Sequence, residues 1–120
     1  MRIAYIWLDD VRPFGGGIHA LHDYDCYTVH SVNEAIDIIT SCELAHEKFI
    51  LNLDHDLGDY AKDGGDGYKL VEWLIETGRN TKNYVVQCHS MNPVGKANIL
   101  ALYNRYFPPF DEDYFFEERD

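Results

Sequence analysis

Three short polar motifs contain most of the side chains in this chain that could do chemistry. They are LDDVRP at residues 8–13, LDHDLG at 53–58 and CHSMNP at 88–93. Each follows an apolar run, and together they supply four carboxylates. Carboxylates that crowd together repel one another unless a cation holds them. The motifs therefore predict a hard divalent metal, Mg²⁺ or Mn²⁺, held by Asp9, Asp10, Asp54 and Asp56. The alternative is that some of these acids cap helices or lie solvated in loops.

The motifs also contain two histidines, His55 and His89. An imidazole in such a place can act as a general base, a general acid or a metal ligand, and the sequence leaves these roles open. A histidine that only hydrogen-bonds a neighbouring loop is the structural alternative. We predict Asp54, His55 and His89 as catalytic residues.

A phosphate would find further partners close by. Ser90 and Asn92, together with the backbone amides that open the next helix, form a natural anion site. The guanidinium of Arg12 can donate two hydrogen bonds to phosphate oxygens, although a salt bridge to a neighbouring Asp would occupy it equally well. We therefore predict Arg12, Ser90 and Asn92 as substrate-binding residues.

The elements that must position these motifs follow from hydrophobic periodicity. Apolar runs predict strands at 3–8, 27–30, 49–53 and 84–88, and helical spacing predicts helices at 31–46, 66–78 and 92–107, with a short helix possible at 18–22. Ser31 and Glu34 form a capping-box pattern, and Asn92 precedes Pro93 as an N-cap. This alternation predicts an α/β fold with a three-layer parallel sheet of about four strands. In strand order 2-1-3-4, the three motifs meet at one edge of the sheet.

Composition narrows the class of protein. The chain has 120 residues and a net charge of −11, with only 10 Lys and Arg, so we expect one domain over 1–120 and no broad nucleic-acid-binding face. There is no apolar run of the roughly 20 residues that span a bilayer, and three scattered cysteines do not suggest a disulfide framework. We expect a soluble, cytoplasmic protein. The acidic, aromatic tail at 107–120 is expected to pack back on the domain, and self-association is the alternative.

The chain resembles the receiver domains of bacterial response regulators. The resemblance lies in Asp9 and Asp10, in Asp54, and in DGYKLVEWL at 66–74. Receivers also have a fifth strand that ends in an essential lysine and a fifth helix, for which the chain beyond residue 107 is too short. The three motifs together are similar to a divergent branch, the cyclic-phosphate processing receiver domains. That resemblance implies a receiver-like (flavodoxin-like) fold and metal-dependent phosphoester chemistry on a cyclic nucleotide or a cyclic-phosphate RNA end.

Three functions of different classes are compatible with these residues. The first is a metal-dependent phosphoesterase that acts on a small phosphorylated ligand. The second is a signalling switch in which Asp54 accepts a phosphoryl group, although the chain lacks the fifth-strand lysine. The third is a module that binds a nucleotide or a protein without turnover.

Overall fold

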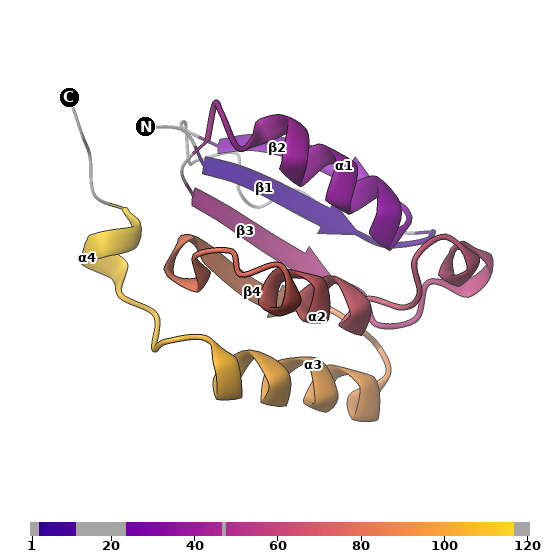
Figure 1. Cartoon of the computed structure of the whole chain (residues 1–120). Helices are drawn as coiled ribbons and strands as arrows, with labels where there is room; N and C mark the ends of the chain where they lie inside the picture. Colours follow the sequence, from indigo (N-terminus) through magenta and orange to yellow (C-terminus); the bar gives the residue numbers. More distant parts are fainter. Residues whose placement is uncertain (1–2, 12–23, 47, 117–120) are drawn as a thin grey trace.

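The sheet has four parallel strands in the order β2-β1-β3-β4, as predicted (Figure 1). The computed structural model describes residues 3–11, 24–46 and 48–116. The strands are β1 (Ile3–Leu8), β2 (Tyr24–Val29), β3 (Lys48–Leu53) and β4 (Tyr84–Cys88). Within these described ranges there is no fifth strand. The receiver-like α/β fold is therefore confirmed in a shortened form.

Three helices cover one face of the sheet: α1 (Val32–Cys42), α2 (Tyr68–Glu76) and α3 (Pro93–Tyr106) (Figure 1). Alternate residues of β1 point to this face, and Ala4, Ile6 and Leu8 are completely buried there. They form one core with apolar residues of all three helices, including Ala35, Leu70 and Ile99. Two short 3₁₀ helices, η1 (Gly58–Lys62) and η2 (Thr81–Asn83), lie in the connections.

The opposite face contacts the end of the described chain. After α3 the chain crosses to this side and forms α4 (Glu112–Phe115) (Figure 1). Phe115 is 1% exposed and packs against Ile3, Tyr5 and Ile50. The aromatic tail thus supplies an apolar contact on the face that the longer helices leave uncovered. The short helix expected at 18–22 lies outside the described residues.

Local signals set most helix ends. The Ser31 hydroxyl accepts a hydrogen bond from the Glu34 amide at 3.1 Å, as an N-cap does. The Glu34 carboxylate accepts from the His30 amide and not from that of Ser31, so the predicted capping box is displaced by one residue. Gly78 ends α2 with φ +69°, a left-handed conformation that glycine adopts without strain.

Two predicted boundaries were wrong. Strand β2 begins at Tyr24, three residues before the predicted start, because it pairs with β1 along its whole length from Ile3 onward. As an edge strand it is only partly buried, so its apolar pattern is weak. Helix α1 ends at Cys42, four residues early, and a turn leads to the buried His46.

In the part of the chain that the structure describes, every helix is too short or too polar to cross a bilayer. The three cysteines are free, and Cys26 is exposed.

Candidate active site at the carboxyl edge of the sheet

Backbone hydrogen bonds fix three of the predicted site residues at the carboxyl edge of the sheet. The amide of Asp9 donates to the carbonyl of Val29, that of Asp54 to Leu8, and that of His89 to Leu53, at distances of 2.8–3.1 Å. Each bond extends the parallel ladder one residue beyond a strand. The side chains are therefore held by the sheet itself and not by a flexible loop.

These three residues form what we call the acid–histidine group. One ligand atom from each of Asp9, Asp54 and His89 lies within 4.8 Å of the others. Asp9 is 0% exposed and Asp54 is 8% exposed. His89 Nε2 lies 2.9 Å from Asp9 Oδ2. Two buried carboxylates with an imidazole fit a divalent cation, because burying the negative charges is costly without a nearby positive one.

The surroundings of His89 include residues that the sequence analysis missed. Its ring stacks on Trp7, with centroids 3.8 Å apart and an angle of 3° between the planes. Its Nδ1 lies 2.7 Å from Asn52 Oδ1, and Asn52 Nδ2 donates to the Tyr5 hydroxyl at 2.8 Å. One signal for Asn52 was available: it is a polar residue inside the apolar strand FILNL. Parallel strands buried on both faces are nearly continuous apolar runs, so a polar interruption marks a possible function.

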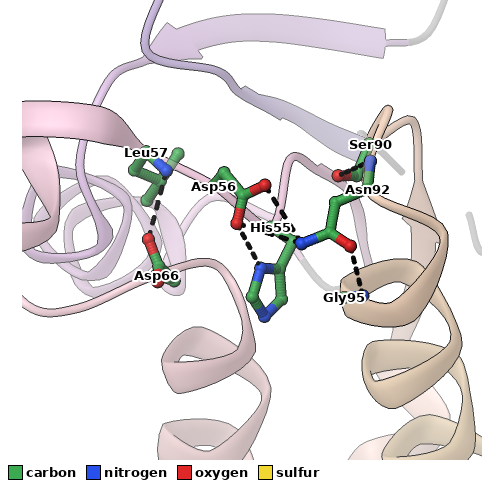
Figure 2. Close-up of polar contacts among 7 residues, drawn as sticks. All are labelled: His55, Asp56, Leu57, Asp66, Ser90, Asn92 and Gly95. Carbon is green, nitrogen blue, oxygen red and sulfur yellow. Dashed lines mark hydrogen bonds and ion pairs between the residues drawn. The ribbon is translucent and has the colours of Figure 1, made fainter.

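His55 takes part in a second arrangement, which we call the His55 dyad, formed by His55 and Asp56. His55 Nδ1 lies 2.7 Å from Asp56 Oδ1, and because a carboxylate only accepts, Nδ1 is the donor. Asn92 Nδ2 donates to the same carboxylate at 3.1 Å (Figure 2). The hydrogen bond from His55 holds the pKa of Asp56 below its usual value, and the bond from Asn92 acts in the same direction. These contacts orient the ring and direct its other nitrogen away from Asp56 (Figure 2).

A groove between α2 and α3 begins at His55. It has a volume of ≈ 780 Å³ and is lined by residues from both helices, among them Tyr68, Lys69 and Arg105. Two glycines allow close packing against Asp54 and His55. A Cβ at Gly95 would lie 2.4 Å from His55 Cγ, and one at Gly67 would lie 2.0 Å from the Asp54 carbonyl oxygen. The observed positions of His55 and of the Asp54 backbone therefore depend on residues without side chains at positions 67 and 95.

The structure distributes the predicted site residues over more than one place. Asp10 and Asp56, predicted as ligands of the same metal as Asp9 and Asp54, lie outside the acid–histidine group, within the residues the structure describes. Asp10 lies against Gly58: a Cβ added at Gly58 would be 2.8 Å from Oδ2 of Asp10. Asp56 instead forms a possible ligand cluster with His55 and Asp66. The four acids thus do not form one compact ligand group among the described residues, and their shared metal site stays a prediction.

The residues predicted to bind substrate have structural partners. The Asn92 amide oxygen accepts from the Gly95 amide at 3.0 Å as the N-cap of α3, while the Ser90 hydroxyl accepts from the Asn92 amide (Figure 2). Both side chains thus shape the loop next to the His55 dyad. Arg12 lies outside the described residues.

Comparison with known proteins identifies one matching family. A family model described as "Cyclic-phosphate processing Receiver domain" matches residues 4–105, which include both the acid–histidine group and the His55 dyad. No curated protein and no solved structure matches the chain. Because the match covers most of the sequence, from β1 almost to the end of α3, the chain belongs to the family of cyclic-phosphate processing receiver domains.

Proposed function

We propose that this protein is a divalent-metal-dependent phosphoesterase that hydrolyses a cyclic phosphate, on a cyclic nucleotide or at the end of an RNA. The observation that carries the proposal is the acid–histidine group, in which two buried carboxylates and an imidazole converge at the carboxyl edge of a parallel sheet. Ligands of open α/β sheets bind at this edge. The family description points to the same substrate class.

In this proposal Asp9, Asp54 and His89 hold the metal. A divalent cation bound there would polarise the phosphate and lower the pKa of a bound water. Of the two cations expected from the sequence, Mn²⁺ suits a site with an imidazole better than Mg²⁺ does. Asp10 and Asp56 are assigned other roles, because they lie outside this group among the described residues.

We assign proton transfer to His55. In the hydrolysis of a cyclic phosphate, water adds to phosphorus, one of the two ring P–O bonds breaks, and the leaving sugar oxygen gains a proton to balance the one that the water loses. His55 lies at the groove between α2 and α3, which has room for a substrate, and Asp56 fixes the orientation of its ring through Nδ1. The Nε2 atom is then the one that can accept or give the proton.

The remaining predicted residues are proposed to help bind the phosphate. Among the residues that the structure describes, the Ser90 hydroxyl serves as an acceptor for the Asn92 amide, so its proton remains to donate to a phosphate. Asn92 would act mainly by holding Asp56 and the start of α3. The proposed cytoplasmic location is supported by the free cysteines, which persist in a reducing compartment.

The test is turnover of 2′,3′-cyclic nucleotides, cyclic dinucleotides and RNA with a cyclic-phosphate end, with Mn²⁺, with Mg²⁺ and with a chelator. We expect metal-dependent hydrolysis of at least one of these substrates, and a loss of about 10²-fold or more in His55→Ala. His30→Ala is the matched control, because His30 follows the edge strand β2, which does not neighbour β3, and its side chain is half exposed.

Other outcomes would favour the other classes of function. Stable labelling of Asp54 by a small phosphodonor, without turnover, would identify a signalling switch. Tight binding of a nucleotide with neither turnover nor labelling would identify a binding module. Failure of all three substrate classes with every cation would refute the phosphoesterase.

A further inference from the structure

The ring of His89 is fixed by three neighbours on the sheet. Trp7 stacks on its face, Asn52 contacts Nδ1, and the Asp9 carboxylate lies beside Nε2. Trp7 and Asn52 are direct partners in the register of β1 and β3. The side chain of His89 is only 14% exposed, so these contacts leave it little freedom to turn.

The Asn52 amide oxygen faces Nδ1 of His89 at 2.7 Å. The amide of Asn52 is placed with Nδ2 on the Tyr5 hydroxyl and Oδ1 toward His89. An amide oxygen can only accept, so Nδ1 must donate its hydrogen. A neutral imidazole has one N–H, and the lone pair of Nε2 then faces Asp9.

That arrangement places two acceptors side by side. His89 Nε2 and Asp9 Oδ2 are 2.9 Å apart, and Asp9 is completely buried. Two acceptors at this distance repel each other unless a positive species lies between or beside them. A second proton on the ring removes this repulsion, and so does a metal ion bound by both atoms with Asp54 as a third ligand. A histidine that binds metal commonly donates its other N–H to a fixed acceptor, as His89 does to Asn52.

We propose that His89 binds the cation through Nε2, that Asn52 and Tyr5 are positioning residues for this bond, and that the site prefers Zn²⁺ or Mn²⁺ to Mg²⁺. The preference follows from the donor set, because imidazole nitrogen suits transition metals, whereas Mg²⁺ takes oxygen ligands. The inference rests on the proposed function only in placing a cation at this group. Every measurement below is independent of turnover.

The first measurement is ¹⁵N NMR of the histidine side chains, with Zn²⁺ as a diamagnetic probe and His89→Ala to assign the signals. We expect Nδ1 of His89 to carry hydrogen in the zinc-bound protein, and the signal of Nε2 to change on addition of Zn²⁺. An Nε2–H form that persists at saturating Zn²⁺ would overturn the proposal. It would mean that the Asn52 amide is turned over and that His89 simply donates to Asp9.

The second measurement is titration calorimetry with Zn²⁺, Mn²⁺ and Mg²⁺. Asn52→Leu removes the acceptor while keeping a similar volume, and we expect it to weaken Zn²⁺ binding by about 10- to 100-fold. Tyr5→Phe, which removes only the hydroxyl that orients the amide, should weaken it less. Gln87→Leu is the matched control, because Gln87 is an exposed amide and the register partner of Asn52 on β4. We expect it to change the affinity by less than about twofold.

The two kinds of failure can be told apart. Affinity for Zn²⁺ that is unchanged in Asn52→Leu and Tyr5→Phe, or a preference for Mg²⁺ over Zn²⁺ in the wild type, would overturn the inference. If Asn52→Leu fails to fold, the zinc affinity of Tyr5→Phe and the wild-type ¹⁵N spectra still test whether His89 binds the cation through Nε2. A protein that binds Zn²⁺ as expected but hydrolyses no substrate would refute the proposed function and leave this inference standing.

Discussion

Gly95→Ala is expected to displace the His55 ring and to destabilise the protein through that contact. A methyl group at this position would lie 2.4 Å from Cγ, 2.6 Å from Nδ1 and 2.9 Å from Cβ of His55. Overpacking of this kind costs about 1–3 kcal/mol. Alanine is the better helix former by about 1 kcal/mol, which offsets part of that cost.

A double-mutant cycle separates the two contributions. His55→Ala removes two of the three clashing atoms, so in that background Gly95→Ala should cost at least about 1 kcal/mol less than in the wild type. The free energies of unfolding of the four proteins are measured by urea denaturation. Lys96→Ala, at an exposed position of the same helix, is the control and should change stability by less than about 0.5 kcal/mol.

Activity gives an independent readout of the same displacement. Moving the ring breaks its hydrogen bond to Asp56, so Gly95→Ala should lower turnover nearly as much as His55→Ala does. The reasoning would be refuted if the two substitutions were additive within about 0.3 kcal/mol, or if Gly95→Ala kept full turnover.

Three further predictions test other parts of the structure. Asp54→Asn keeps the shape of the side chain but removes a negative charge from the acid–histidine group. We therefore expect turnover to be lost, while the metal-free protein melts at the same or a slightly higher temperature. Near-normal turnover at saturating metal would show that the site has been misplaced. The pKa of Asp56 is lowered in the folded state, so its carboxylate stabilises the fold above its unfolded pKa, and this contribution is lost as the pH falls through the folded pKa. Between about pH 5 and about pH 3, urea stability should therefore fall more steeply in the wild type than in Asp56→Asn, and equal slopes would contradict the assignment. Phe115→Ala should cost about 3–5 kcal/mol in free energy of unfolding, because this ring is 1% exposed, and similar losses in Phe115→Ala and in the 41%-exposed Phe116→Ala would mean that the tail does not pack as described.

Much of the fold was determined by the sequence alone. The strands β1, β3 and β4 are apolar runs with clear ends, and α3 begins at the predicted N-cap Asn92. The strand order was accessible because it places the three strands that end in the polar motifs next to one another. The start of β2 was not accessible, because the residues of this strand are mostly only partly buried and lack a strong apolar pattern.

The division of the site was decided by the tertiary structure. Successive side chains at the end of a strand point to opposite faces, so neighbours in the motif DHD need not meet. Asp54 joins Asp9 and His89, whereas His55 lies at the groove between α2 and α3. Which of these side chains lie on the same face of the sheet depends on the register of three strands, and no single motif contains that information.

The same reason explains why the partners of His89 were missed. Tyr5 and Trp7 are ordinary aromatic residues of a buried strand when the sequence is considered alone. They become partners of Asn52 and His89 only because β1 and β3 pair with Trp7 opposite Asn52. The sequence therefore determined which residue types could do chemistry, and the pairing of the strands decided which of them act together.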